Sequence, residues 1–230
     1  DRTPHWRYHG QILPQVNILL KLPSRSRPMK MLHAYHEAMR LAAIPGRIFP
    51  LFALDNDDRA SLREWATLGL SLDTLAKGPR ATKVEAVNRG IGSDTRTWDI
   101  VVVISDDMIC QHAGWDKEVS AAFAEGDLDR CAHFPDGHQT VLCTLPVMGR
   151  AYFDRFGYVY HPEYDSLWCD NKQTDVALRD GKMLRSDVVL FRHDHPAWGT
   201  GRWDPLYRHN EGKNAKDKAT YERRKALDFQ

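Results

Sequence analysis

Residues 100–107 read Ile-Val-Val-Val-Ile-Ser-Asp-Asp, and this stretch decides the class of fold. Ile100 to Ile104 form a continuous β-branched run, which is typical of a strand buried on both faces of a parallel sheet. The run stops abruptly at Ser105, Asp106 and Asp107. Ligands bind at the carboxyl ends of strands in open α/β sheets, so we expect the two aspartates to lie in a functional site.

The chain before this strand repeats the order strand, loop, helix. β-branched and aliphatic runs alternate with stretches whose apolar side chains have helical spacing. This alternation indicates an α/β protein with a mostly parallel central sheet flanked by helices. The predicted strands are residues 16–22 and 47–54. One predicted helix begins at Pro28, and two others cover residues 60–68 and 83–91.

The pattern is less regular after residue 107. An aromatic-rich, irregular segment covers residues 152–168, and the chain ends in a charged tail with a terminal amphipathic helix. The remaining predictions are helices over 115–124, 174–179 and 218–229 and strands over 140–145 and 186–192.

Composition sets limits on the class of protein. The chain has 230 residues, of which 42% are hydrophobic, enough for one sizeable domain. Its longest aliphatic run is far below the roughly 20 residues of a transmembrane helix. The net charge of +1 argues against bulk attraction to nucleic acid or anionic lipid. No secretory signal opens the chain and no C-x-x-C pair occurs, so we expect free thiols and a cytoplasmic location.

Several common catalytic signatures are absent from the sequence. It contains no G-x-G-x-x-G and no G-x-x-x-x-G-K-[ST], which disfavours a dinucleotide oxidoreductase and a P-loop NTPase. It also lacks a G-x-S-x-G elbow and an H-E-x-x-H zinc motif.

Two pairs of side chains suggest a metal site. Asp106 and Asp107 together could hold a hard divalent cation at the end of their strand. His193 and His195 end a later strand and are two residues apart, so both rings face one side, and imidazole joins carboxylates on manganese. The alternatives are a solvated acidic turn and a pair of packed or surface histidines.

Two further segments carry candidate functional groups. Asp170 precedes a predicted helix, where it could act as a general base, or where it or Asn171 could simply cap the helix. The loop of residues 23–28 follows the first strand and contains two arginines and two serines before a helix, which suits a phosphate or a nucleotide.

Taken in order, these segments resemble the GT-A glycosyltransferases, in particular the family 2-like enzymes. Residues 22–28 resemble the family's loop after the first strand, and residues 54–58 resemble its acidic turn after the second. Residues 83–90, Lys-Val-Glu-Ala-Val-Asn-Arg-Gly, are similar to its K-x-x-A-x-N-x-G helix. Ser105-Asp106-Asp107 stands at the D-x-D position, and Cys169-Asp170 at the E-D pair, each with one substitution.

The resemblance implies a role for each of these positions. Asp170 would be the catalytic base, and Mn²⁺ or Mg²⁺ would be held by Asp107 and His195, with His193 as the second choice. The donor-binding residues that it implies are Pro23, Ser24, Arg25, Asp55, Lys83, Asn88, Asp106 and Arg202.

The resemblance also implies a domain organisation and an activity. We expect an N-terminal extension over 1–15, a GT-A catalytic domain over 16–200, and a tail and helix over 201–230 that pack on the site or close over it. The enzyme would move a sugar from a nucleotide-diphosphate donor, a UDP-sugar, to an acceptor hydroxyl with inversion. Two alternatives remain: a nucleotidyltransferase, and a non-catalytic module that binds nucleic acid or sugar.

The acceptor is open at this point. Small enzymes that resemble this one glycosylate hydroxymethylated pyrimidines in DNA, and the tail from Arg202 to Lys225 has an excess of basic residues that would suit DNA phosphates, although a solvated helix face is the more common reason for such an excess. Carbohydrate, lipid and protein acceptors also stay open. We expect one or two aromatic residues to stack on a sugar ring, and the rest to pack in the core. The candidates are Trp115, Tyr152, Tyr158, Tyr160, Tyr164, Trp168 and Trp198.

Overall fold

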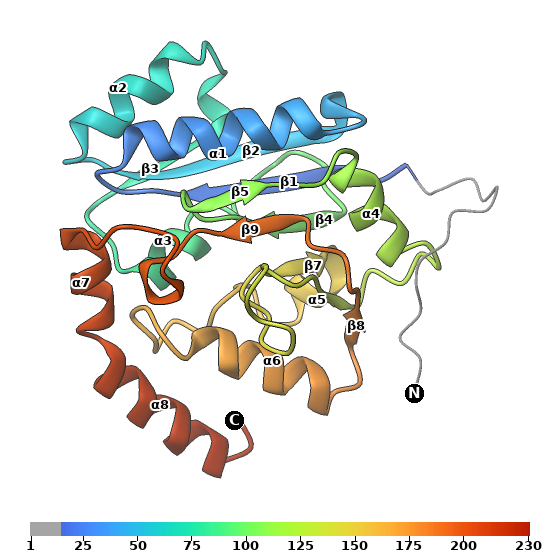
Figure 1. The fold of residues 1–230 in the computed structure, drawn as a ribbon. Helices are drawn as coiled ribbons and strands as arrows, with labels where there is room; N and C mark the ends of the chain where they lie inside the picture. Colours follow the sequence, from blue (N-terminus) through green and yellow to red (C-terminus); the bar gives the residue numbers. More distant parts are fainter. Residues whose placement is uncertain (1–14) are drawn as a thin grey trace.

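The computed structural model describes residues 15–230 and contains a seven-stranded sheet in the order β3-β2-β1-β4-β7-β6-β8 (Figure 1). Strands β1 to β4 are parallel, whereas β7 runs antiparallel to both β4 and β6. The predicted α/β class with a mostly parallel sheet is confirmed. The strands are β1 Ile18–Pro23, β2 Ile48–Asp55, β3 Leu75–Gly78, β4 Ile100–Val103, β6 Cys131–His133, β7 Val147–Gly149 and β8 Met183–Arg185.

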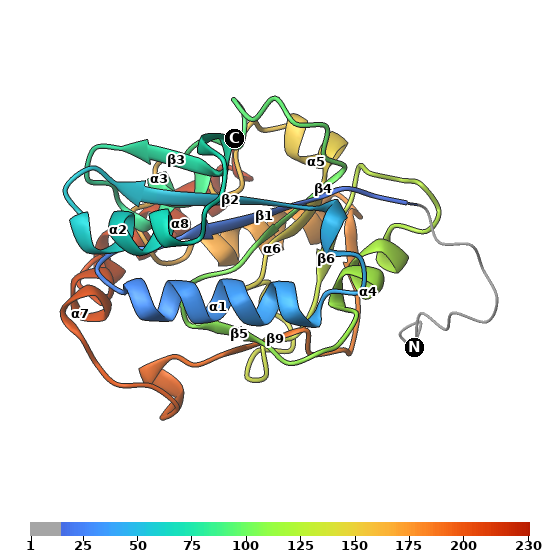
Figure 2. The ribbon, with the colours of Figure 1, turned by 90° about the horizontal axis from the view of Figure 1, so that it is seen from above.

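Helices cover both faces of this sheet. Helices α1 and α2 lie on one face, and α3, α5 and α6 lie on the other (Figure 1). A separate antiparallel pair, β5 Met108–Cys110 with β9 Phe191–His193, lies beside α1 (Figure 2). The helices are α1 Pro28–Leu41, α2 Arg59–Thr67, α3 Lys83–Asn88, α4 Trp115–Ala122, α5 Arg150–Asp154, α6 Cys169–Arg179, α7 Pro205–Glu211 and α8 Asn214–Ala226, with 3₁₀ turns at Pro45–Arg47, Leu72–Thr74 and Pro196–Trp198.

The core explains why β4 is a continuous apolar run. Ile100, Val102 and Ile104 pack into the cluster beneath α1 and α2, while Val101 and Val103 pack into the cluster against α3 and α5. Each of these five side chains is buried. A strand with two dry faces needs apolar residues at every position rather than at alternate ones.

The register of the parallel strands brings the candidate segments to one edge. Lys21 of β1 is level with Val103 of β4, and Pro23 is level with Ala53 of β2. Ser24, Asp55 and Ser105 consequently leave the sheet at the same edge. This edge is where a functional site is expected in an open α/β sheet.

Some predicted elements differ from the structure. The strand predicted over 140–145 is wrong: these residues form a loop, and the strand that pairs with β4 begins at Val147. The strand predicted over 186–192 shrinks to β9, and the helix predicted over 174–179 begins five residues earlier, at Cys169. Strands β3, β5, β6 and β8 have only three or four residues, too few for a recognisable pattern.

The C-terminal tail packs on the main domain. Helix α8 lies against α6, and the Asp217 carboxylate accepts hydrogen bonds from the backbone N–H groups of residues 165, 166 and 167 at 3.0, 2.8 and 2.8 Å. The predicted extension over 1–15 falls, apart from Gln15, outside the described residues. All four cysteines are free and buried. Among residues 15–230, no helix combines the length and apolar character that a membrane span needs.

Candidate functional site

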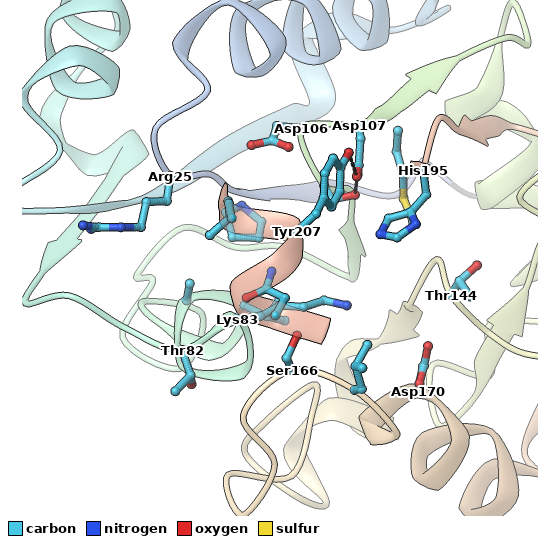
Figure 3. Close-up of a pocket in the computed structure, with 18 of the residues that line it drawn as sticks. Arg25, Thr82, Lys83, Asp106, Asp107, Thr144, Ser166, Asp170, His195 and Tyr207 are labelled. Atoms are coloured by element: carbon cyan, nitrogen blue, oxygen red, sulfur yellow. Dashed lines mark hydrogen bonds between the residues drawn. The ribbon is translucent and has the colours of Figure 1, made fainter. Parts of the chain in front are cut away.

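An open cavity of about 310 Å³ lies at the carboxyl edge of the parallel strands (Figure 3). It collects side chains from β1, β2, β4, α3, α6, β9 and α7, which are far apart in the sequence. Most of the residues predicted for the site line this cavity. They are Pro23, Ser24, Arg25, Asp55, Lys83, Asp106, Asp107, Asp170, His193 and His195.

Asp106 is a buried carboxylate with two partners. It accepts a hydrogen bond from the Ser24 hydroxyl at 2.7 Å and one from Arg27 Nη1 at 3.0 Å. Burial and the neighbouring charge of Asp107 raise the pKa of Asp106 above its ordinary value. The loop after β1 thus supplies the groups that keep this carboxylate in place.

Asp107 is also buried, but its environment favours the charged form. Its Oδ2 accepts a hydrogen bond from the Tyr207 hydroxyl at 2.6 Å, and its Oδ1 accepts one from Ser105 and lies 3.5 Å from His193 Nε2. Burial alone would raise the pKa of Asp107, but the contacts with His193, Ser105 and Tyr207 hold that pKa well below its usual range. Figure 3 shows the contact with Tyr207.

Arg27 links the acidic pair to the C-terminal segment. Its guanidinium group contacts Asp106, forms two 2.8 Å hydrogen bonds with Asp204, and lies 3.7 Å from the ring centre of Tyr207. The sequence predicts a phosphate-binding role for the arginine pair of this loop, and the resemblance implies a donor contact for Arg25 rather than for Arg27. The partners of Arg27 are about 80 and 177 residues away, so no local pattern indicates them.

Arg25 is held at the end of β2. It contacts Asp55 at 2.6 Å and forms two hydrogen bonds with Asp57 at 2.7 and 2.8 Å. Arg89 contacts the other oxygen of Asp55 at 3.1 Å. These carboxylates raise the pKa of Arg25 above its ordinary value. The acidic turn and the arginine loop therefore form one paired wall of the cavity.

The two histidines have different environments. His193 lies between Asp107, at 3.5 Å, and Asp136, at 3.4 Å. Although burial acts in the opposite direction, these carboxylates raise the pKa of His193 to about 9. The ring of His195 packs on Tyr207, and its burial and the nearby charge of His193 lower its pKa to about 4.

The hydrogen bonding of His195 bears on its predicted metal role. Its Nδ1 accepts a hydrogen bond from the backbone N–H of Ala197 at 3.2 Å. A neutral imidazole whose Nδ1 accepts carries its proton on Nε2. Metal ligation through Nε2 would require the loss of this contact, whereas the ring of His193 already lies beside Asp107.

Asp170 and Lys83 lie around the same cavity as the acidic pair. Asp170 is in the first turn of α6, and its Oδ1 accepts a hydrogen bond from the backbone N–H of Asn171. Figure 3 shows Arg25 and Thr82 on one side of the cavity and Thr144, His195 and Asp170 on the other. Lys83 begins α3 after a Thr82 capping box, and it makes no hydrogen bond or ion pair with any of residues 15–230.

Two predicted donor contacts lie outside the cavity. The side chain of Asn88 donates to the carbonyl of Tyr160 at 2.6 Å and accepts from the N–H groups of Val159 and Tyr160, so it holds that segment in place. Arg202 is exposed and does not line the cavity. The structure does not bring either residue to the candidate site.

Asp106 and Asp107 fit a divalent cation by the chemistry of their oxygen donors. Mg²⁺ and Mn²⁺ prefer carboxylate oxygens, and Mg²⁺ sites typically use one or two carboxylates together with water and phosphate oxygens. Within the described chain, no cluster of three or more histidine, cysteine, aspartate or glutamate side chains is arranged to enclose a metal. The residues present therefore suit an open site that a ligand completes.

Comparison with known proteins gives no match by sequence. No protein-family model matches the chain, and no curated protein matches it. The fold, in contrast, is similar to that of several solved structures. The similarities are therefore structural, at 12–13% identity.

The mannosyltransferase PcManGT from Pyrobaculum calidifontis, solved with GDP-Man and Mn²⁺, has a TM-score of 0.58 at 13% identity, over 88% of this chain and 70% of that one. Glucosyl-3-phosphoglycerate synthase from Mycobacterium tuberculosis, solved with Mn²⁺, UDP and glucosyl-3-phosphoglycerate, has a TM-score of 0.57 at 12% identity, over 84% and 75%. S. aureus TarS 1-349 has a TM-score of 0.55 at 12% identity, over 77% and 60%. The chain therefore has the GT-A fold, as its motifs predicted.

Proposed function

We propose that this protein is a metal-dependent glycosyltransferase that moves a sugar from a nucleoside diphosphate donor, a UDP-sugar, to an acceptor hydroxyl with inversion. The observation that carries the proposal is a single cavity with three kinds of group around it. An acidic pair, Asp106 and Asp107, ends β4; Asp170 begins α6; and cationic side chains line the wall formed by the loops after β1 and β3.

The leaving nucleoside diphosphate needs its charge to be offset. Asp107 and Asp106 would hold the divalent cation, and such a cation, when bound, neutralises part of the diphosphate charge. The similar structures of PcManGT and glucosyl-3-phosphoglycerate synthase were solved with Mn²⁺ and a nucleotide, which supports this assignment.

Two cations of the cavity are available for the phosphates. Arg80 and Lys83 line it and make no hydrogen bond or ion pair with any part of the chain that the structure describes. Arg25 and Arg27, in contrast, are already paired with aspartates. We therefore assign the contacts with the donor phosphates to Arg80 and Lys83.

Asp170 is the proposed base. As the acceptor oxygen forms its bond to the anomeric carbon, the bond from that carbon to the phosphate oxygen breaks, and Asp170 takes the hydroxyl proton. The nucleoside diphosphate then leaves. A single displacement of this kind inverts the anomeric centre.

The test is release of nucleoside diphosphate from a panel of UDP- and GDP-sugars with Mn²⁺. We expect Asp107→Ala to abolish the release and the Mn²⁺-dependent thermal stabilisation by the nucleotide. Asp170→Asn should bind donor normally but transfer no sugar. Glu125→Gln, an exposed substitution outside the cavity, is the matched control. Full activity in excess chelator would reject the metal role, and release of pyrophosphate would indicate a nucleotidyltransferase instead.

The structure bears on hydroxymethylated DNA as the acceptor. Most basic residues of the tail are paired with carboxylates, which reduces the cationic surface available to DNA phosphates. The pairs are Lys213 and Lys216 with Asp165, Lys218 with Glu222, Arg223 and Arg224 with Glu163, and Lys225 with Asp175. A DNA-binding module would lose its salt-sensitive binding when the tail is removed, which tests that alternative directly.

A further inference from the structure

Trp198 is the exposed aromatic residue of the cavity. Of the tyrosine and tryptophan side chains that line the cavity within residues 15–230, Tyr160 and Tyr207 are buried, whereas Trp198 is 43% exposed. Trp198 ends the 3₁₀ turn that follows His195. A large aromatic ring exposed at the wall of a cavity is a candidate contact for a ligand.

The ring of Trp198 packs against a histidine ring. It stacks on the His138 ring, with the centroids 5.2 Å apart and the planes at 11°. His138 belongs to a loop that folds around the fully buried Asp136, whose carboxylate accepts from the backbone N–H groups of His138 and Gln139 at 2.9 and 2.6 Å and from the Thr144 hydroxyl at 2.7 Å. The backbone that carries His138 is thereby held in place before any ligand binds, which reduces the entropic cost of binding.

The charges around the cavity are divided. The segments 136–146 and 193–198 contribute no arginine or lysine to the cavity lining, and His193 lies between the carboxylates of Asp107 and Asp136. The lysines and arginines of the lining come from the other segments: Arg25, Arg27, Arg80, Lys83 and Lys213. A phosphate on the acceptor would thus meet carboxylates rather than cations on the side of Trp198.

We propose that the acceptor is a neutral saccharide whose ring stacks on the exposed indole of Trp198 and whose reacting hydroxyl reaches Asp170 in the same cavity. A sugar ring offers C–H groups to the indole and hydroxyls to neutral partners, which Gln139 and Thr144 supply in the cavity lining. A nucleobase would also stack on an indole, but proteins that hold single strands add a cationic groove for the backbone, and this side has none.

That the saccharide acts as the acceptor rests on the proposed function, but the stacking site on Trp198 does not. The two are separated by measuring them independently. Donor binding is followed as thermal stabilisation by UDP-sugars with Mn²⁺. Acceptor binding is followed by saturation-transfer NMR and isothermal titration, with and without UDP and Mn²⁺. A saccharide that binds through Trp198 in a protein that binds no nucleotide would reject the proposed function and keep the site.

The acceptor probes are neutral mono- and oligosaccharides, 3-phosphoglycerate, and single- and double-stranded DNA with 5-hydroxymethylpyrimidines. We expect at least one neutral saccharide to bind, with its Kd raised at least tenfold in Trp198→Ala and much less in Trp198→Phe. Trp203→Ala is the matched control, because Trp203 is 46% exposed on the same segment but does not line the cavity. Circular dichroism verifies that each variant is folded.

Three results would overturn the inference. The first is that no neutral saccharide binds. The second is binding confined to DNA or to 3-phosphoglycerate. The third is an unchanged saccharide Kd in Trp198→Ala.

Discussion

Replacement of Arg27 by methionine should strongly destabilise the protein, because it leaves a buried carboxylate without its cation. The side chains of Arg27 and Asp106 are only 9% and 4% exposed, and their charged atoms are 3.0 Å apart. At an effective dielectric constant of about 20, the attraction at this distance is about 5.5 kcal/mol, before the cost of dehydration is subtracted. Breaking a buried pair by removing one partner costs about 3–5 kcal/mol.

We expect the lower end of this range for Arg27→Met. The pKa of Asp106 is already raised, so the orphaned carboxyl can take up a proton and escape part of the penalty. A loss of about 3 kcal/mol corresponds to a fall in Tm of about 6–12 °C for a chain of this size. Arg40→Met, which removes an exposed pair with Glu37, is the control and should barely change Tm.

A double-mutant cycle identifies the cause of the loss. Asp106→Asn removes the charge and keeps an oxygen for the Ser24 hydroxyl, so it should rescue part of Arg27→Met, with a coupling of about 1–3 kcal/mol in urea unfolding. The rescue is partial because Arg27 also loses Asp204 and Tyr207. Losses that add to within about 0.5 kcal/mol would refute the reasoning, because the two side chains would then not be energetically coupled.

Three further predictions concern residues that position the cavity or the helices behind it. Asn88→Ala should cost about 2–3 kcal/mol through its three hydrogen bonds, without weakening donor binding in a thermal-shift titration; weaker binding at unchanged stability would restore the predicted donor contact. Asp217→Ala should remove the hydrogen-exchange protection of amides 165–167, which lead into α6, and unchanged protection would contradict its anchoring role. Lys172 is 2% exposed, and its pKa is lowered to about 8, mainly by burial and to a smaller extent by the charge of Arg224. Between pH 8 and about 10.5 the unfolded state therefore binds more protons than the folded state, so the free energy of unfolding rises with pH. Lys172→Met should remove this pH dependence of stability and should stabilise the protein at pH 7 by about 3 kcal/mol. Lys218→Met, at an exposed lysine, should change neither the pH dependence nor the stability. Equal pH dependence of stability in the two variants would refute the buried-lysine explanation.

The parts of the fold that the sequence predicted are those determined by burial. The run from Ile100 to Ile104 shows that both faces of β4 are dry, and parallel pairing then brings Ser24, Asp55 and Asp106 to one edge. The loop at 140–145 has a strand-like composition, but only Cys143 and Leu145 are buried, whereas Val141 is exposed, and the loop follows a turn built on Asp136. A side chain bonded to the backbone leaves no periodic signal.

The candidate site was predictable to a similar extent. The site residues that follow strands were predictable, because the carboxyl ends of parallel strands lie at the same edge of a sheet. The contacts of Arg27 with Asp106 and Asp204, and that of Tyr207 with Asp107, are not predictable in this way because they join residues that are far apart in the sequence. Asn88 was identified by its motif, but the structure shows that it holds the segment at 159–160.

Buried aspartates hold the loops of this site in position. Their contacts are not evident from the sequence. Four of these aspartates accept backbone N–H groups of loops, and three of these loops, at 24–27, 138–139 and 165–167, contribute residues to the cavity lining. A short carboxylate satisfies two or three donors that no strand partner satisfies, and leaving such donors unpaired would cost about 1–3 kcal/mol each. In the sequence these residues look like the acidic turns that predict metal sites, so aspartate content alone overstates metal binding in this chain. The four are Asp58 for residue 26, Asp116 for 43 and 44, Asp136 for 138 and 139, and Asp217 for 165–167.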